Sequence, residues 1–448
     1  MHSILTNGKP PNKREILRLV KERDVRYIRM AFVDILGISK NVMIPATELE
    51  RAFAGKVTFD GGSIDGFVRG EEADMMLLPD LSTFAVYPWT AGGHQEARLI
   101  CDIATPDGEP FEGCPRTTLQ RAIDDASDVL SGVTSGFEVE FYLFELGPDG
   151  APTTSSADCG SYFDINESDR GENVRMEIVS ALEAMGLAVA SAHHEHGAGQ
   201  HEIDIKETGP LGAADALVTI RTVAKHVAAR HGLHATFMPK PSEALAGSGA
   251  HVYFTLPKGA AESASQSDDE LAEDTLFAIG GLLEHAPAFT AICNPTVNSY
   301  KRLVAAWDAP IYTVWSRRSA NSLVRVPSSE NGGSRIEMRS ADGACNPYLA
   351  MAVLLASLAH GVRTHALPGD PLTGSTYDLN ERERERRRIR TLPKSLRQAL
   401  VELEKDLVVR GALGDHIYHA FRDAKFAEYE SYRRAVHPWE RTAYLRIY

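Results

Sequence analysis

Residues 136–144 of this 448-residue chain place two carboxylates inside an apolar and aromatic run, Gly-Phe-Glu-Val-Glu-Phe-Tyr-Leu-Phe. Side chains alternate between the two faces of a β-strand, so Glu138 and Glu140 project from the same face. The apolar residues of the run occupy the other face, which we expect to pack in the core. Two neighbouring anions repel each other and lose hydration unless cations lie between them. The segment is therefore either a metal site or a strand with one solvated face.

The composition indicates a soluble globular protein of two or three domains, with 43% hydrophobic residues. A formal net charge of −14 argues against nucleic acid or an anionic membrane as the main partner. The five cysteines are scattered and form no Cys-x-x-Cys pair, which fits reduced thiols in the cytoplasm. The first residues lack the apolar segment of a signal peptide, and no uninterrupted apolar stretch reaches the length of a membrane span. We expect a cytoplasmic protein.

Periodicity predicts an α+β chain in two parts. An amphipathic helix at 12–23 and alternating strands at 26–33 and 98–103 indicate a first domain at 14–108, and turn-forming residues near 106–116 separate it from a second domain at 109–448. In the second domain isolated strands and long helices indicate an antiparallel sheet backed by helices. The predicted strands are 137–145, 201–206, 234–238, 250–256 and 334–339, and the predicted helices are 117–130, 172–185, 211–231, 270–287, 346–364 and 394–408.

Further segments carry metal-type ligands in positions that can reach one cavity. With the first strand they supply five glutamates and one histidine: Glu138, Glu140, Glu195, Glu202, Glu337 and His251. Mostly oxygen ligands with one imidazole suit Mg²⁺ or Mn²⁺ better than Zn²⁺. Carboxylate-held divalent ions beside several arginines neutralise the charge of a transferring phosphoryl group, so ATP is the expected substrate. The sequence has neither a P-loop nor a kinase-type glycine-rich loop.

Ten segments, in this order and spacing, resemble type I glutamine synthetase. They are Phe59-Asp60-Gly-x-Ser63-Ile, Glu138-x-Glu140-Phe, Tyr162-Phe163, His193-His194-Glu195, Gly199-Gln200-x-Glu202, Ala235-Thr-Phe-Met-Pro-Lys240-Pro, Gly247-Ser-Gly-x-His251, Asn298-Ser-Tyr-Lys-Arg302, Arg335-Ile-Glu337-x-Arg339 and Asn346-Pro-Tyr-Leu. The resemblance runs from about residue 14 to the C-terminus. It implies an N-terminal β-grasp domain at 14–108 and a catalytic domain of the glutamine synthetase type at 109–448.

The resemblance also implies a reaction and its participants. ATP phosphorylates the γ-carboxylate of glutamate, and ammonium then amidates the acyl phosphate to give glutamine, ADP and phosphate. Two or more Mg²⁺ or Mn²⁺ ions serve each active site. The family forms rings, so the resemblance implies a homo-oligomer, which we expect to be a dodecamer, in which the β-grasp domain of one subunit completes the active site of the next.

Roles for individual residues follow from the same resemblance. Glu138, His251 and Glu337 bind the metal on the ATP side, and Glu140, Glu195 and Glu202 bind the metal on the acceptor side. Arg302 and Arg339, beside the loop at Gly247, bind the amino-acid substrate. Tyr253, Thr255, Arg325 and Arg335 fall at nucleotide and phosphate positions, Asp60, Ser63, Tyr162 and Glu195 form the ammonium pocket, and Asp60, Asp308 and Arg325 are the catalytic residues.

The sequence departs from the family pattern at several of these places. Ala246 and Ala250 stand where the family has asparagine and methionine, Asp308 replaces a glutamate in a flap, and Ala320 replaces an arginine that Arg318 could substitute for. Three functions therefore stay open. They are glutamine synthesis, ligation of glutamate or a related acid to another amine by a γ-glutamyl ligase, and a catalytically weak regulatory or structural role. The complete metal-ligand set argues against the third.

Overall fold

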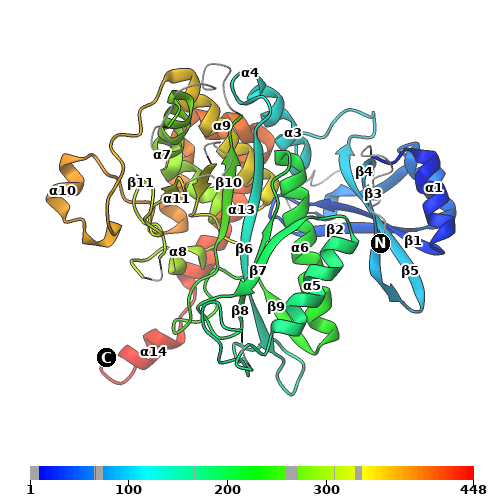
Figure 1. Ribbon diagram of the computed structural model, residues 1–448, viewed down its shortest axis with the longest axis horizontal. Coiled ribbons are helices and arrows are strands. Elements are labelled where there is room, and N and C mark those ends of the chain that lie inside the picture. Colours follow the sequence, from blue (N-terminus) through cyan, green and yellow to red (C-terminus); the bar gives the residue numbers. More distant parts are fainter. Residues whose placement is uncertain are drawn as a thin grey trace.

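The computed structural model of the protein describes residues 10–448, except 65, 67–73, 166, 258–270, 307 and 328–334. Two β-sheets organise the described chain, one of five strands near the N-terminus and one of eight strands that follows (Figure 1). Each sheet has its own apolar core. The α+β class predicted from the sequence is confirmed.

The N-terminal sheet has the strand order β2-β1-β5-β4-β3, in which β1 and β5 run parallel and the other pairs run antiparallel. Helix α1 begins at Asn12, which forms a capping box with Glu15, and it buries Ile16 in the core beside the sheet. The elements are α1 (Lys13–Glu22), β1 (Val25–Val33), β2 (Ser39–Pro45), η1 (Ala46–Glu48), α2 (Leu49–Phe53), β3 (Val57–Asp60), η2 (Gly61–Ser63), β4 (Asp74–Ala91) and β5 (His94–Ala104).

The second sheet has the order β11-β12-β13-β10-β6-β8-β7, and β9 pairs with β6. The prediction of an antiparallel sheet is correct for every pair except β11 and β12, which are two-residue strands that run parallel at the edge. The strands are β6 (Thr134–Glu145), β7 (Val189–His194), β8 (Gln200–Ile205), β9 (Leu233–Thr236), β10 (Ala250–Thr255), β11 (Trp315–Ser316), β12 (Val324–Arg325) and β13 (Arg335–Met338).

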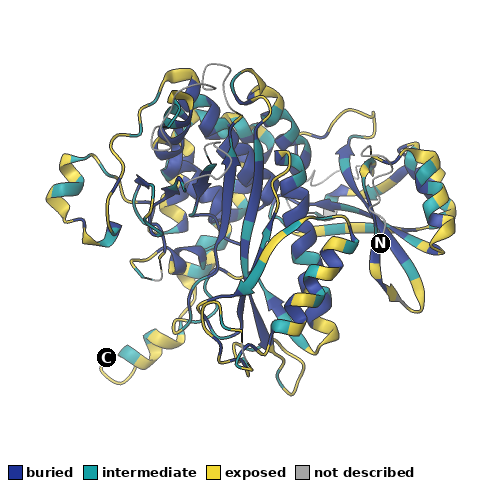
Figure 2. Cartoon of the chain, viewed as in Figure 1, coloured by how far each residue is buried: buried dark blue, intermediate teal, exposed yellow. Residues whose placement is uncertain are grey.

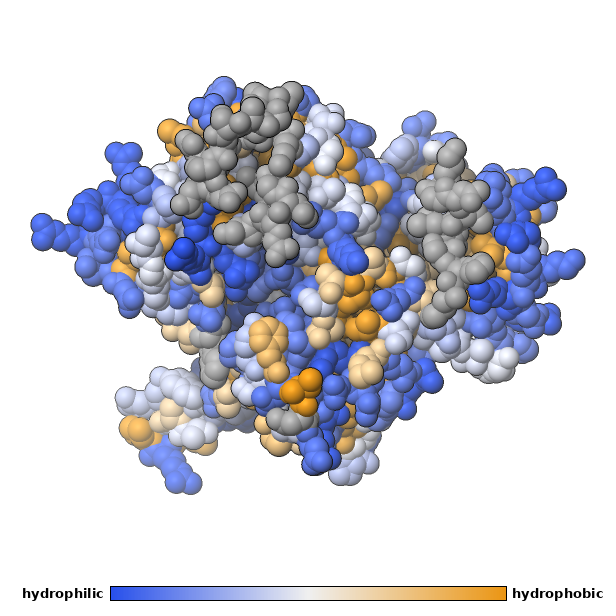
Figure 3. Space-filling model, in the orientation of Figure 1, coloured by the Kyte–Doolittle hydropathy of each residue, from blue (hydrophilic) through white to orange (hydrophobic). Residues whose placement is uncertain are grey.

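Helices back this sheet, and the buried residues of α6, α7 and α9 join the strands in one apolar core (Figure 2). The helices are α3 (Pro115–Asp125), α4 (Ser127–Leu130), α5 (Glu172–Ala184), α6 (Pro210–Arg230), α7 (Glu273–Cys293), α8 (Ser299–Arg302), α9 (Pro347–Thr364), η3 (Thr376–Asp378), α10 (Glu381–Arg386), α11 (Leu396–Lys405), α12 (Leu407–Leu413), α13 (Asp415–Arg434) and α14 (Pro438–Tyr444). The mixed Glu/Arg helix α10 is largely exposed, and the face of the protein that contains it is mostly hydrophilic (Figure 3).

Helix α7 continues past Pro287, where the sequence predicted its end. Proline cannot donate to the carbonyl four residues earlier, which belongs to Leu283. The structure satisfies that carbonyl with Arg390, whose Nη2 donates to Leu283 O at 2.7 Å. Helix α7 is also apolar and long enough to cross a membrane by length and composition, but 78% of its most apolar window is buried inside the protein, as in a core helix.

Buried polar contacts fix the N-terminal sheet against the second one. The Arg116 guanidinium at the start of α3 contacts Asp80 of β4 at 2.7 Å, Asp102 of β5 at 2.9 Å and Asp215 of α6 at 3.0 Å. The N-terminal core includes Cys114, so residues just beyond 108 pack with the first sheet. A domain boundary between residues 108 and 109 stays a prediction.

Candidate active site

The register of the second sheet aligns the predicted metal ligands across neighbouring strands. Glu138 of β6 lies opposite His251 of β10, and Glu140 of β6 lies opposite Glu202 of β8. On the far side of β10, Glu337 of β13 lies opposite Arg325 of β12. Because directly opposed side chains on one face are about 5 Å apart, the register brings polar groups from five strands to one place.

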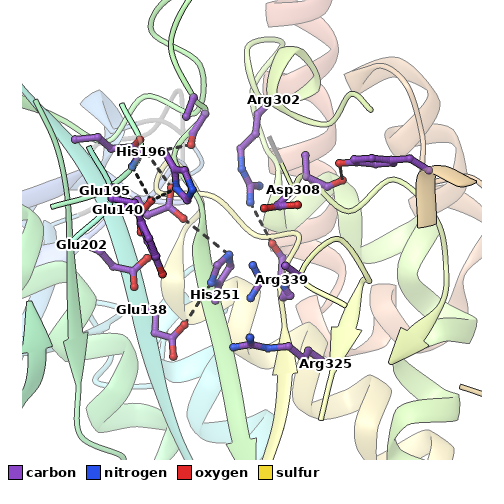
Figure 4. Close-up of a pocket in the computed structure, with 17 residues that line it drawn as sticks. Glu138, Glu140, Glu195, His196, Glu202, His251, Arg302, Asp308, Arg325 and Arg339 are labelled. Carbon is purple, nitrogen blue, oxygen red and sulfur yellow. Dashed lines mark hydrogen bonds and ion pairs between the residues drawn. The ribbon is translucent and has the colours of Figure 1, made fainter. Parts of the chain in front are cut away.

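All of these side chains except Glu337 line a cavity of about 410 Å³. Acidic groups from β6 and β8 lie on one side of it, arginines lie on the other, and His251 lies between them (Figure 4). The residues that line the cavity are Glu138, Glu140, Tyr162, Glu195, His196, Gln200, Glu202, Ala246, Gly247, His251, Arg302, Asp308, Ala309, Ala320, Arg325, Arg339 and Tyr377.

One group of ligand atoms comes from Glu138, His251 and Glu337, which all lie within 4.8 Å of one another. His251 Nδ1 is 3.4 Å from Glu138 Oε2 and 3.6 Å from Glu337 Oε1. Burial alone would raise the pKa of Glu138, but His251 and the guanidinium groups of Arg335 and Arg325 lower it to about 2. This carboxylate is therefore ionised at neutral pH and available to a cation.

Two further groups share Glu202: one joins it to Glu140 and His251, and the other joins it to His193 and Glu195. Burial raises the pKa of Glu202 well above its usual value, and repulsion from Glu140, Asp204 and Glu195 adds to this effect. The pKa of Glu140 is also raised, first by burial and then by Glu195. A concentration of buried anions that destabilise one another fits a divalent cation, which would remove the repulsion.

We expect metal binding at this cluster to release protons. A carboxylate whose pKa is raised keeps its proton between the usual value near 4.5 and its raised value, and a metal ion binds only the ionised form. Calorimetric titration of the metal-free protein with Mg²⁺ in buffers of different ionisation enthalpy measures this release. It should be largest at mildly acidic pH and disappear as the pH rises above the raised pKa values. Binding without proton release at every pH would contradict the titration assignment.

Two of the predicted arginines bind the buried carboxylate of Glu337. Arg325 Nε donates to Glu337 Oε2 at 2.5 Å, and Arg339 Nη1 forms a short contact with Glu337 Oε1. Arg335 lies farther along the sheet, where its Nη2 donates to Glu138 Oε1 at 2.9 Å. The guanidinium groups therefore lie directly beside the first group of ligands, where they can meet the phosphates of a nucleotide.

Arg302 has a larger structural role than the sequence predicted. Its Nη1 donates to Ser340 O at 2.7 Å and its Nη2 donates to Arg339 O at 3.1 Å. The loop at Gly247 can pass over this side chain only without a Cβ, which would lie 2.7 Å from Arg302 Cγ. The small residue at Gly247 therefore permits a buried guanidinium at the edge of the cavity.

Tyr253 and Thr255 lie outside the residues that line the cavity. The Tyr253 hydroxyl donates to the backbone carbonyl of Ile205, and its ring lies 3.6 Å beneath the Arg335 guanidinium. Thr255 Oγ1 donates to Glu207 at 2.9 Å. In this structure Tyr253 therefore supports Arg335 and does not itself open to the cavity, although the sequence analysis placed both residues at nucleotide positions.

The predicted ammonium-pocket residues are not all brought together within one chain. Tyr162 lines the cavity, but Asp60 is the last residue of β3 in the N-terminal sheet and does not line it. Asp60 caps the turn that follows it by accepting a hydrogen bond from Gly62 N at 2.8 Å. The side chain of Ser63, like residue Trp307 of the predicted flap, lies outside the described part of the chain.

Some of the residues that depart from the family pattern line the cavity, and others lie outside it. Ala246, Asp308 and Ala320 line the cavity. Ala250 is fully buried opposite Val139 and does not line the cavity. Its small side chain therefore does not enlarge the space for a substrate. Arg318 is exposed and also does not line the cavity, which gives no support to the idea that it replaces the missing guanidinium.

Four further residues reach the site without a role predicted for them. Gln200 Nε2 donates to Glu140 Oε2 at 3.0 Å, and His193 Nε2 lies 3.2 Å from Glu202 Oε1. His196 Nδ1 lies 2.9 Å from Glu195 Oε2, and its ring stacks on that of Tyr162 with centroids 4.4 Å apart. Tyr377 also lines the cavity. The density of histidine near Glu195 was the available signal for His193 and His196.

Comparison with known protein families identifies the family of this chain. The profile of the glutamine synthetase catalytic domain matches residues 112–444, and the profile of the glutamine synthetase β-grasp domain matches residues 24–106. The chain belongs to the glutamine synthetase family. Two glutamine synthetases are each 44% identical to it: one from Thermus thermophilus over 442 residues, covering 97% of this chain and 99% of the relative, and one from Staphylococcus aureus over 439 residues, covering 97% and 98%.

Three solved structures share the fold of this chain. A complex of GmaS with ADP is 30% identical, has a TM-score of 0.86, and aligns over 96% of this chain and 99% of its own. GmaS without ligand gives a TM-score of 0.84 at the same identity and coverage. A cryo-EM structure of Plasmodium falciparum glutamine synthetase is 23% identical, with a TM-score of 0.83 over 97% of this chain and 99% of its own, and supports the fold. The predicted β-grasp and catalytic domain types are confirmed.

Proposed function

We propose that this protein is an ATP-dependent ligase that makes glutamine from glutamate and ammonium, releasing ADP and phosphate. One observation carries the proposal: a cavity lined by five of the six metal-type ligands and by arginines, in a chain 44% identical over almost its full length to proteins named glutamine synthetase. We assign magnesium or manganese to the two groups of carboxylates. When bound, these ions neutralise phosphate charge and polarise the reacting oxygens.

The residues around the cavity fit the first half of the reaction. The γ-carboxylate oxygen of glutamate attacks the terminal phosphorus of ATP, and the bond to ADP breaks as the acyl phosphate forms. We assign Arg325 and Arg335 to the negative charge that spreads over the phosphoryl oxygens. The support is their position beside Glu337 and Glu138. We assign Arg302, Arg339 and the loop at Gly247 to glutamate, and Tyr253 and Thr255 to the outer edge of the nucleotide site.

The second half requires an ammonium ion to lose a proton before its nitrogen attacks the acyl carbon and expels phosphate. We assign this step to Asp60, with Ser63, Tyr162 and Glu195 around the ammonium ion. Within one chain Asp60 lies in the other sheet from the cavity, which supports our proposal that the active site lies between subunits of a homo-oligomer, a dodecamer. Mixing two inactive variants, Asp60→Asn and Glu202→Gln, tests this arrangement. Activity returns on mixing only if Asp60 acts in a neighbouring subunit.

Tyr377 holds the segment that carries Asp308 over the cavity. Its hydroxyl donates to Ala309 O at 2.8 Å, and Asp308 has a left-handed backbone with φ of 56°. We assign to this segment the exclusion of water from the acyl phosphate. Tyr377→Phe should therefore raise the ratio of ATP hydrolysed to glutamine formed about five- to tenfold, as expected for the loss of one hydrogen bond. Tyr312→Phe is a matched control outside the cavity, and an unchanged ratio in Tyr377→Phe would contradict the assignment.

The proposed activity is tested by ATP-dependent phosphate release with glutamate. Ammonium is compared with a panel of primary amines, and glutamate with other carboxylic acids. We expect glutamate with ammonium to give the highest kcat/KM. Turnover only with another amine or acid would overturn glutamine synthesis in favour of a γ-glutamyl ligase. Absence of turnover with every pair would favour a regulatory or structural role.

A second candidate, ligation to a larger amine, is favoured by the small residues Ala246 and Ala320 at the cavity wall. Ala320→Arg separates the two functions. For glutamine synthesis we expect the added guanidinium to raise kcat/KM with ammonium by up to about a hundredfold. Ala320→Gln controls for side-chain size without the charge. If the wild-type acceptor is a larger amine, Ala320→Arg should instead lower turnover of that amine by filling its space.

We place the enzyme in the cytoplasm, as a participant in nitrogen metabolism. All five cysteines are free thiols, and four of them are buried, as is usual in a reducing compartment. Titration of accessible thiols in protein isolated from its native cells tests this placement, because an oxidised Cys159 would contradict it.

A further inference from the structure

A separate group of metal-type ligands lies where α7 and α9 meet the start of α12. Glu284 and His285 belong to α7 and His360 belongs to α9, and one ligand atom from each lies within 4.8 Å of the others. His285 Nε2 is 2.9 Å from His360 Nδ1. None of the three residues lines the catalytic cavity, and the reaction proposed above does not use them.

Asp406 determines which nitrogen of His285 faces this group. Its Oδ1 accepts hydrogen bonds from Val408 N and Val409 N, each at 3.0 Å, and its Oδ2 lies 2.7 Å from His285 Nδ1. Because Asp406 already accepts from two backbone amides, it also accepts from His285 Nδ1, and the lone pair on His285 Nε2 points toward His360.

This is the arrangement that metal-bound histidines adopt. A ligating imidazole usually donates its other nitrogen to a carboxylate, which fixes the ring and increases its basicity. Burial decreases across the group, because His285 is 5% exposed, His360 is half-buried and Glu284 is exposed. An ion can therefore enter from solvent past Glu284 and meet two oriented nitrogens.

We propose that Glu284, His285 and His360 bind one Zn²⁺ ion, with water as the fourth ligand. Two imidazole nitrogens and one carboxylate suit zinc, whereas the oxygen-rich catalytic cavity suits magnesium or manganese. Binding requires His360 to change tautomer: its Nδ1 gives up the proton that it shares with His285 Nε2, and its Nε2 takes one up from solvent, so that both rings bind as neutral imidazoles. Ligands of a tetrahedral zinc ion lie roughly 3.3 Å apart, so the exposed Glu284 side chain needs only a small movement.

The bound ion would strengthen the connection among three helices that are otherwise joined by packing and by the hydrogen bonds of His285 to His360 and Asp406. It links α7 to α9 directly, and it links both to α12 through Asp406. Asp406 acts here as a positioning residue, because it contacts His285 and does not touch the ion. The expected consequence is a higher melting temperature of the zinc-loaded protein.

Zinc content of the full-length protein tests the proposal. Wild type, His360→Gln and Glu284→Gln are saturated with Mg²⁺ and ADP, dialysed against a low buffered concentration of free Zn²⁺, and analysed by mass spectrometry of the metals. We expect wild type to retain one zinc ion per chain more than either variant. The readout is the difference in zinc content between wild type and each variant. Zinc that enters the catalytic cavity is present in all of the proteins and does not contribute to this difference. His94→Gln, at an exposed position on β5, is the matched control and should retain as much zinc as wild type.

A second measurement shows the ligands directly. Co²⁺ in place of Zn²⁺ should give wild type a tetrahedral ligand-field absorption band that His360→Gln lacks, and Zn²⁺ should raise the melting temperature of wild type but not of this variant. Melting without zinc checks that His360→Gln is folded, and Glu284→Gln changes only an exposed side chain. A zinc content equal to wild type in either variant would overturn the proposed ligand set. Equal zinc in all proteins would overturn the site itself.

Discussion

Replacing Glu202 with glutamine should abolish most of the activity and at the same time stabilise the metal-free protein. Glu202 is a buried carboxylate that lies opposite Glu140 across two strands, and burial followed by repulsion from its neighbours raises its pKa. A raised carboxylate pKa means that ionisation destabilises the folded state, and this loss is complete once the pH exceeds the raised value. Glutamine keeps an oxygen that can accept from His193 but carries no charge.

The two expected effects have different sizes and different readouts. Loss of one metal ligand should lower kcat/KM on the order of a thousandfold. Relief of the repulsion should raise the free energy of unfolding by about 1–2 kcal/mol at neutral to mildly alkaline pH. Denaturant unfolding with a chelator present measures the second effect. With saturating Mg²⁺ the order should reverse, because wild type binds the ion more tightly and is stabilised by mass action.

Glu145→Gln is the matched control for Glu202→Gln. Glu145 is an exposed residue at the end of β6 on the same sheet, so neither its activity nor its stability should change. A metal-free Glu202→Gln protein that unfolds more easily than wild type would show that the acidic cluster is not under electrostatic stress. That outcome would remove the main physical support for a cation at this place.

Glu337→Gln should abolish activity as well, but its effect on stability has the opposite sign. Glu337 is 1% exposed and accepts from both Arg325 and Arg339. Removing its charge leaves two guanidinium groups without their carboxylate in a largely buried place. We expect the free energy of unfolding to fall by about 3 kcal/mol with or without metal, and kcat/KM to fall on the order of a thousandfold.

Glu430→Gln is the matched control for this variant. Glu430 pairs with Arg433 at 2.7 Å on an exposed face of α13, where solvent screens the interaction and its loss should not be measurable. Urea unfolding of wild type, Glu337→Gln and Glu430→Gln measures these changes in stability. If Glu337→Gln and Glu202→Gln shift stability in the same direction, the charge environments of the two metal-ligand groups are not different in the way the contacts indicate.

Much of the candidate site could be predicted from the sequence because strand alternation is a local property. The apolar partners of Glu138 and Glu140 fixed which face carries the carboxylates, and the structure places both side chains in the cavity. The register between strands is not local. No short-range pattern indicates that Glu138 lies opposite His251 or that Glu140 lies opposite Glu202.

The incorrect and missing predictions also depend on contacts between distant segments. The end assigned to α7 at Pro287 was wrong because the satisfaction of Leu283 O by Arg390 depends on a residue more than one hundred positions away. The assignment of Arg302 to the substrate stays a prediction, whereas its bonds to backbone carbonyls of residues 339–341 depend on contacts that no short-range pattern indicates. No role was predicted for Tyr377, whose bond to Ala309 depends on how two loops pack.

Metal affinity depends on strand register, because Glu140 must lie opposite Glu202 and Glu138 must lie opposite His251. A shift of β6 by one residue would turn both of its glutamates into the apolar core and bring Phe137 and Val139 to the cavity. A misregistered sheet would therefore both lose its ion site and bury two charges. Divalent ions present during folding would bind selectively to chains whose strands are correctly aligned, and they would penalise an insertion or deletion within β6 much more than one in the loops beyond it.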